Sequence, residues 1–214
     1  MRAEELSSRE PGFATEQEAF WAGEFGDRYS SRNSGERWIA SNTALFSRVL
    51  SRLSHVQSVL EIGANIGLNV RALQRLLPES EIAGLEINEA AADELERTGC
   101  TVFRGSALSF TPDKTYDFVF SKGVLIHISP EHLSTVYSLM HRASNRYIFL
   151  AEYYSPRPES ISYHREDERL FRRDFAGELL DAFRDLRLVD SGFAYHRGPF
   201  PQDDLTWFVL EKTQ

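Results

Sequence analysis

The chain has little of what disulfide-linked, zinc-binding or membrane-spanning proteins usually need. It contains one cysteine, Cys100, which excludes an intrachain disulfide. It has neither a Cys-x-x-Cys pair nor a dense Cys/His cluster, so we expect no metal site. The N-terminal MRAEELSSREPGF is polar where a secretory signal is apolar, and no run approaches the roughly 20 apolar residues of a membrane span. We therefore expect a cytoplasmic protein without a membrane partner.

Basic residues are also fewer than acidic ones. The 24 lysines and arginines are outnumbered by 32 acidic residues, which gives a formal net charge of -8. Such a balance opposes extended contact with nucleic acid and favours a small-molecule partner. At 214 residues and 42% hydrophobic composition, the chain is expected to form one domain, as a monomer or homodimer.

Short apolar runs alternate with helical stretches from Ser58 onward. VLEI, EIAGLEI, TVFRG, YDFVFS and RYIFLAEYY have the character of strands, with stretches such as NEAAADELERTG between them. This alternation predicts a doubly wound α/β fold with a mostly parallel sheet. We expect a further helix over residues 169–183. Two closing strands, LRLVDSGFAYH and LTWFVLEK, are joined by a short link that predicts antiparallel pairing at the end of the sheet.

Helical segments are expected before this alternating region. Thr15 and Glu18 have the spacing of a capping box, which predicts a short helix over residues 15–23. Apolar residues at helical spacing predict a longer helix over 36–53. Between the two helices, the segment EFGDRYSSRN is interpreted as a polar loop.

The stretch LEIGANIG places Gly63 and Gly67 after the first strand of the alternating region. In an open parallel sheet, ligands bind beyond the carboxyl ends of the strands. A dinucleotide turn has a middle glycine that admits a diphosphate, but Ala64 or Asn65 occupies that position here. The next strand ends at Glu86, an acid that can accept hydrogen bonds from both ribose hydroxyls. The pattern favours a cofactor with an adenosine and no phosphates, such as S-adenosylmethionine, over ordinary turn glycines.

LEIGANIG, GLEIN, FRGSAL and YDFVFSKGVLIHI resemble the successive motifs of class I S-adenosylmethionine-dependent methyltransferases, over roughly residues 58 to 152. The resemblance implies a seven-stranded, Rossmann-like sheet with its last strand antiparallel. It also implies a methyltransferase domain at 58–214, preceded by a helical segment at 1–57 that acts as a lid. FWAGEFGDRYSSRN, AEYYSPRP and YHRGPFPQDDLTWFVLEK are similar to the methylases associated with pseudaminic acid biosynthesis. That narrower resemblance implies a nonulosonic sugar, or its nucleotide-activated form, as acceptor.

The resemblance also assigns residues to S-adenosylmethionine. Residues placed near its methionine portion are Glu61, Gly63 and Gly67, with Asn65 in the same turn; Glu86 is placed at the ribose, and Ile87, Ser106 and Ala107 at the adenine. Most relatives have an aspartate near Ser106, and a serine binds the adenine amino group less strongly. Tyr29 and Arg32 are candidates for the cofactor carboxylate, with an ordinary surface loop as the alternative.

Methyl transfer from a sulfonium chiefly requires alignment of the acceptor and exclusion of water. A hydroxyl acceptor gains from a general base, whereas a neutral amine does not need one. His127 is the candidate base, with a buried structural histidine as the alternative. Tyr154 is a second catalytic candidate, although a phenol with a pKa of about 10 suits a pocket wall better. Lys122 is a candidate for the cofactor or for an acceptor anion, with a solvated loop lysine as the alternative.

A basic cluster follows the strand RYIFLAEYY. The acceptor-binding candidates are Lys122, Tyr153, Tyr163, His164, Arg165, Arg169 and His196. Because arginine binds carboxylates and phosphates bidentately, the cluster suits an anionic sugar or sugar nucleotide. The alternative is that its arginines pair with neighbouring acids on a solvated helix. The alternative functions are a methyltransferase for another small metabolite and a non-catalytic protein that binds S-adenosylmethionine.

Overall fold

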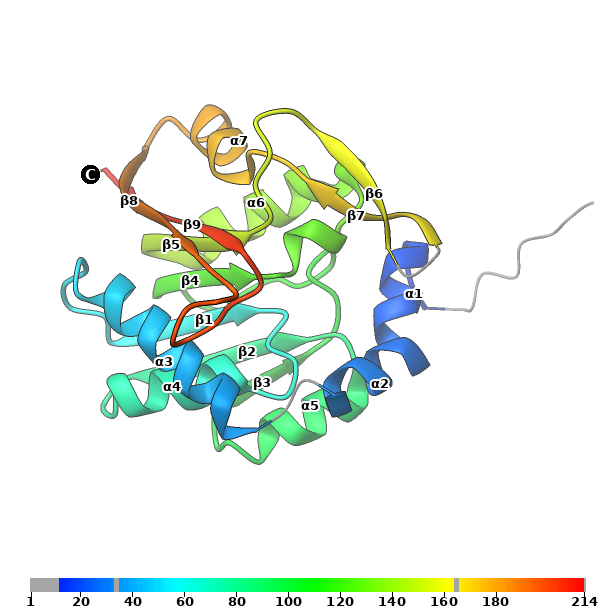
Figure 1. The fold of residues 1–214 in the computed structure, drawn as a ribbon. Helices are drawn as coiled ribbons and strands as arrows, with labels where there is room; N and C mark the ends of the chain where they lie inside the picture. The colour runs from blue at the N-terminus through cyan, green and yellow to red at the C-terminus, as the bar shows by residue number, and fades with distance from the viewer. Residues whose placement is uncertain (1–11, 33–34, 164–165, 214) are drawn as a thin grey trace, which may run out of the picture.

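The structure, a computed structural model, describes residues 12–32, 35–163 and 166–213. Its main sheet has seven strands in the order β3-β2-β1-β4-β5-β9-β8 (Figure 1). The strands are β1 (Ser58–Ile62), β2 (Glu81–Glu86), β3 (Thr101–Arg104), β4 (Tyr116–Lys122), β5 (Ser144–Glu152), β8 (Leu186–Ala194) and β9 (Leu205–Lys212). β1 to β5 pair in parallel, and β9 runs antiparallel between β5 and β8. The predicted Rossmann-like fold, with its last strand antiparallel, is confirmed.

Alternate side chains of the strands enter two apolar layers. Leu60 and Ile62 of β1 pack in the layer formed with α6 (Leu133–Ala143) and α7 (Phe175–Ala182). Val59 packs in the opposite layer, together with residues of α3 and α4. The helices of this second face are α3 (Glu36–Leu50), α4 (Leu68–Leu76) and α5 (Glu89–Glu96). Because both faces are covered, the strands have nearly continuous apolar sequences.

The N-terminal helices differ in part from the expectation. α1 (Glu16–Ala22) is capped by Thr15 with both bonds of the predicted capping box, and α3 ends at Leu50, three residues earlier than expected. The interpretation of EFGDRYSSRN as a loop was wrong, because most of it forms α2 (Glu24–Arg32).

An aromatic stripe explains the second helix. Trp21 lies near the end of α1, and Phe25 and Tyr29 follow at four-residue spacing in α2, where residues four apart lie on one face. The rings of Phe25 and Tyr29 both pack against Trp21, each at a centroid distance of 5.3 Å. This local apolar packing outweighs the polar composition of the remaining residues.

The helix expected over residues 169–183 was wrong in its first part. β6 (Glu159–Tyr163) and β7 (Glu166–Arg172) form an antiparallel hairpin, and α7 begins only at Phe175. Antiparallel pairing with β6 gives the backbone of β7 hydrogen-bond partners, and the side chains of Leu170 and Phe171 are buried. Asp174 then caps α7, because its carboxylate accepts the N–H of Gly177 at 2.9 Å. The hairpin packs against η1 (Leu125–His127), the turn that follows β4.

Candidate functional site

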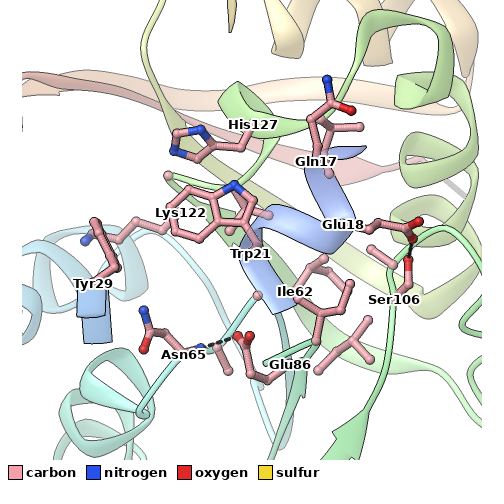
Figure 2. A pocket seen from close by; sticks show the side chains of 18 of the residues that line it. Gln17, Glu18, Trp21, Tyr29, Ile62, Asn65, Glu86, Ser106, Lys122 and His127 are labelled. Atoms are coloured by element: carbon pink, nitrogen blue, oxygen red, sulfur yellow. Dashed lines mark hydrogen bonds between the residues drawn. The ribbon is translucent and has the colours of Figure 1, made fainter. Parts of the chain in front are cut away.

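Strand order reverses between β1 and β4, and a pocket lies beyond the carboxyl ends of these strands (Figure 2). Its walls come from α1, a residue of α2, two residues of α3, the turn after β1 with the start of α4, the ends of β2 and β4, and the loops that follow β3 and β4. The sequence candidates that line it are Tyr29, Gly63, Asn65, Glu86, Ile87, Ser106, Ala107, Lys122 and His127. The topology therefore brings most of the predicted cofactor residues to one cavity.

The two glycines of the first turn have different surroundings. Gly63 has a φ of 74° and lines the pocket; an added Cβ would lie 2.6 Å from Val124 Cγ2. Gly67 has a φ of 80° and precedes α4, where a Cβ would lie 2.9 Å from Leu95 Cδ1 and Thr98 Cγ2. Both positions exclude larger residues, but Gly67 is buried behind the turn and is not part of the pocket wall.

Glu86 is held at the tip of β2 by two backbone groups. The N–H of Asn65 donates to its Oε2 at 2.7 Å, and the N–H of Asn88 donates to its Oε1 at 2.8 Å. Burial raises the pKa of this carboxyl group, whose residue is 8% exposed, while the two N–H groups oppose that shift. Since a carboxylate has about four acceptor positions, capacity remains for hydroxyl groups in the pocket.

Glu61 and Asn69 form a second buried polar pair next to the pocket. Asn69 Nδ2 donates to Glu61 Oε1 at 2.5 Å, whereas Glu61 Oε2 and Asn69 Oδ1 have no hydrogen-bond partner in the described part of the chain. Burial raises the pKa of Glu61, which is 1% exposed, to about 8. Asn69 lines the pocket and Glu61 lies behind it. A cationic group bound at this place would favour the ionised form of Glu61, whose oxygens are acceptors. The sequence interpretation missed Asn69.

Lys122, at the end of β4, supplies a positive charge to the same cavity. Burial lowers the pKa of its amine, and the charges of Asp203, Glu61 and Glu152 oppose that shift. Figure 2 shows Lys122 and Tyr29 on the side of the pocket opposite Glu18 and Ser106. Asp203, from the link between β8 and β9, also lines the pocket and was missed from the sequence.

Glu152 organises the turn that carries His127. Its carboxylate accepts from Ser121 Oγ at 2.7 Å and from the N–H groups of Val124 and Leu125 at 3.2 Å each. Burial raises the pKa of Glu152 to about 7. His127 lines the pocket from this turn, is 9% exposed, and packs its ring 4.5 Å from that of Trp21.

The helix α1 forms a wall that the sequence interpretation did not place. Thr15, Gln17, Glu18 and Trp21 all line the pocket. Glu18 is 7% exposed, and Ser106 Oγ donates a hydrogen bond to its carboxylate. The capping box predicted the helix from local sequence, but no local signal shows what a helix packs against.

Besides Glu61 and Gly67, three described candidates lie outside the pocket lining. Tyr154 is 42% exposed, with its ring 6.0 Å from that of Phe208. Tyr153 lies under the guanidinium of Arg172, and the exposed His196 bonds through Nδ1 to Asp204 at 2.8 Å. His164 and Arg165 lie outside the described residues, as do the side chains of Arg32, Tyr163 and Arg169.

The described ranges contain no group of three or more His, Cys, Asp or Glu side chains that could hold a metal ion. Within the same ranges, no helix is long and apolar enough to cross a bilayer.

Comparison with known proteins agrees with this geometry. Residues 59–146 match the family described as "Methyltransferase domain". The match supports a methyltransferase. A search of curated proteins found no match.

Solved structures show the same fold at low sequence identity. Magnesium protoporphyrin IX methyltransferase (ChlM) from Synechocystis PCC 6803, with bound S-adenosylmethionine, has 13% identity and a TM-score of 0.66 over 94% of this chain and 100% of that chain. Streptomyces venezuelae DesVI has 14% identity and a TM-score of 0.63, over 89% and 97%. CalS10, an amino pentose methyltransferase from Micromonospora echinaspora, has 12% identity and a TM-score of 0.62, over 88% and 96%. The fold and the domain match both agree with the predicted class I methyltransferase and its cofactor.

Proposed function

We propose that this chain transfers the methyl group of S-adenosylmethionine to an oxygen or nitrogen of a small polar acceptor. One observation carries the proposal. The turn after β1, Glu86 at the end of β2 and the loop of Ser106 after β3 line a single pocket at the switch point of the sheet. These are the three places that the sequence motifs assign to one cofactor.

The pocket residues divide among the parts of that cofactor by their chemistry. Glu86 has acceptor capacity for ribose hydroxyls, and Ile87 and Ala107 offer apolar surface to the adenine. Asn69 Oδ1, together with Glu61 in its ionised form, would suit the ammonium of the methionine portion. Tyr29 and Lys122 suit its carboxylate. When bound, the cofactor supplies the electrophilic methyl group.

We propose that α1 and α2 form the lid of this site. Four residues of the Thr15–Trp21 segment and Tyr29 of α2 line the pocket, so this pair of helices covers the cavity. A closed cover keeps water from the sulfonium and holds the acceptor in line with the methyl carbon. α3 differs from them: it contributes Trp38 and Asn42 to the lining, but its apolar face packs into the core of the sheet.

His127 is the proposed general base for a hydroxyl acceptor. It lines the pocket on a turn fixed by Glu152, whereas Tyr154 lies outside the lining. His127→Gln should lower kcat for a hydroxyl acceptor about 100-fold or more, with a smaller change in cofactor affinity. Pre-steady-state methyl transfer at several pH values measures this effect. His55→Gln, an exposed site outside the pocket lining, is the control, and an unchanged kcat and pH profile in His127→Gln would give His127 a structural role.

An anionic sugar, of the nonulosonic type or its nucleotide-activated form, is the proposed acceptor. The support is the resemblance of the terminal segments to methylases of pseudaminic acid biosynthesis and the charge of Lys122 in the pocket. The hairpin β6–β7, which contains arginines, packs against the turn of His127. Arginine and lysine side chains bind carboxylate and phosphate groups.

Transfer of a labelled methyl group tests this proposal. The protein is incubated with methyl-labelled S-adenosylmethionine and a panel of free nonulosonic acids, sugar nucleotides and neutral sugars, and products are identified by mass spectrometry. We expect a product one methyl group heavier from an anionic sugar. Methylation of neutral or unrelated metabolites alone would overturn the acceptor class, and NAD binding without S-adenosylmethionine binding would overturn the activity.

A further inference from the structure

The two ends of the pocket differ in polarity. Lys122 and Tyr29 lie on one side, and the opposite side has Glu18 and Ser106 (Figure 2). The loop of Ser106 continues with Ala107 and Leu108, which add apolar surface to the lining. A carboxylate and a hydroxyl, those of Glu18 and Ser106, face each other at this apolar end (Figure 2). A flat heterocycle with a polar edge would fit such surroundings, because its faces contact apolar side chains while its edge needs partners.

The Glu18 carboxylate has a defined orientation. Its Oε2 accepts the N–H groups of Ala14 at 2.6 Å and Thr15 at 2.9 Å, which close the capping box of α1. Its Oε1 accepts the hydroxyl of Ser106. One oxygen therefore serves the helix cap, and the other faces the loop after β3, where it retains capacity for another donor.

Ser106 keeps one acceptor position on its hydroxyl oxygen. Its hydroxyl has a single proton, which is donated to Glu18, and its oxygen accepts the N–H of Leu108 at 2.9 Å. A charged carboxylate is also a stronger acceptor than a hydroxyl. At this end of the pocket, Glu18 Oε1 is thus better suited than Ser106 to bind an amino group.

We propose that Glu18 binds the exocyclic amino group of the cofactor's adenine. The site for that base is then completed by the N-terminal helix and not by the sheet alone, which makes cofactor selection depend on the lid. This inference rests on the proposed function, which supplies an adenosine to the pocket.

A separate set of contacts fixes the position of α1. Asn88, next to the ribose-binding edge, donates through Nδ2 to the carbonyl oxygen of Trp21 at 3.3 Å and to Asp27 Oδ1 at 2.8 Å. Gly26 packs at the same contact between the two helices and Asn88, where an added Cβ would lie 2.0 Å from Trp21 O. The end of α1 opposite Glu18 is therefore held close to the sheet, which keeps Glu18 over Ser106.

Binding of two nucleosides that differ at one group tests the proposal. Calorimetry compares S-adenosylhomocysteine with S-inosylhomocysteine, in which a 6-oxo acceptor replaces the amino donor. For the wild-type protein we expect binding of the amino compound to be at least about tenfold tighter, because the 6-oxo group would face a carboxylate.

In the variant Glu18→Gln, the new side chain has the size of glutamate, and the orientation of its amide group can be predicted. Its amide oxygen must keep the N–H groups of Ala14 and Thr15, since glutamine also completes a capping box, so its NH₂ group faces Ser106 and the ligand. We expect the preference for the amino compound to fall to about one or to invert. Glu16→Gln, an exposed acid on the same helix, should keep the wild-type preference.

Ser106→Ala separates the two members of the pair. It removes the hydroxyl and leaves Glu18 Oε1 in place, so the preference for the amino compound should persist. If Ser106→Ala abolishes the preference while Glu18→Gln, folded by its melting curve, retains it, the assignment of Glu18 is overturned. That outcome leaves the proposed function intact, whereas failure of the wild-type protein to bind S-adenosylhomocysteine at all would overturn both.

Discussion

The sheet wall and the helix wall of the pocket are built in different ways. The sheet wall consists of the turn after β1 and the tip of β2. Two backbone N–H groups fix the carboxylate of Glu86 there: that of Asn88, two residues away, and that of Asn65, 21 residues away in the turn after β1. The helix wall depends on contacts between distant segments: Ser106 and Glu18 are 88 residues apart, and Asn88 and Trp21 are 67 apart. A wall made of local turns is visible in the sequence, whereas a wall made by tertiary packing is not.

The buried acids of the sheet wall give the largest expected effect. The pKa of Glu61 is about 8, against an ordinary value of 4.5 for glutamate, so between these values the folded protein binds more protons than the unfolded chain. The free energy of unfolding should therefore fall as pH rises from about 5 to 8, by up to about 1.4 kcal/mol per pH unit for one such group. Glu61→Gln should flatten this slope, as measured by urea unfolding at several pH values.

The pKa of Glu152 is raised to about 7, so this residue also lowers the free energy of unfolding as pH rises towards 7. Part of the pH dependence of stability should therefore remain in Glu61→Gln. Glu94→Gln, on the exposed face of α5, is the control. A stability that rises with pH across this range in the wild-type protein would contradict the burial of these acids in their protonated form.

Loss of Glu86 should have the next largest effect, and it acts on ligand binding. Glu86→Ala removes the acceptor for ribose hydroxyls and leaves the N–H groups of Asn65 and Asn88 without their partner. We expect the affinity for S-adenosylhomocysteine to fall by about 1 to 3 kcal/mol in calorimetry. Glu94→Ala should bind normally. An unchanged affinity in Glu86→Ala would remove Glu86 from the ribose.

The smallest expected effect tests the helix wall. Asn88→Ser keeps a side-chain cap for α5, since serine is a good N-cap, but loses the donor that reaches Trp21 O and Asp27. Amide hydrogen exchange should become faster in α1 and α2 while that of the sheet stays the same. We expect cofactor affinity to fall about threefold to tenfold. Uniformly faster exchange, in the sheet as well, would show that Asn88 stabilises the whole fold and not the lid.

The same contrast explains which parts of the protein could be predicted. Parallel strands buried on both faces leave clear apolar runs, so the sheet and its order of elements followed from the sequence. The segment 169–172 was predicted as the start of a helix, but it belongs to β7, whose register pairs Arg172 with Glu159 of β6, and no local signal shows that pairing. Glu18 had a correct local role as a capping residue, yet its contact with Ser106 depends on how α1 packs on the sheet.

The central claim is that one pocket at the β1–β4 switch point binds S-adenosylmethionine and not a dinucleotide. Calorimetric titration of the wild-type protein with S-adenosylhomocysteine and, separately, with NAD tests it most directly. The account predicts saturable binding of S-adenosylhomocysteine at one site per chain and no binding heat with NAD, because Asn65 stands where a diphosphate needs glycine. Saturable binding of NAD with no binding of S-adenosylhomocysteine would contradict it.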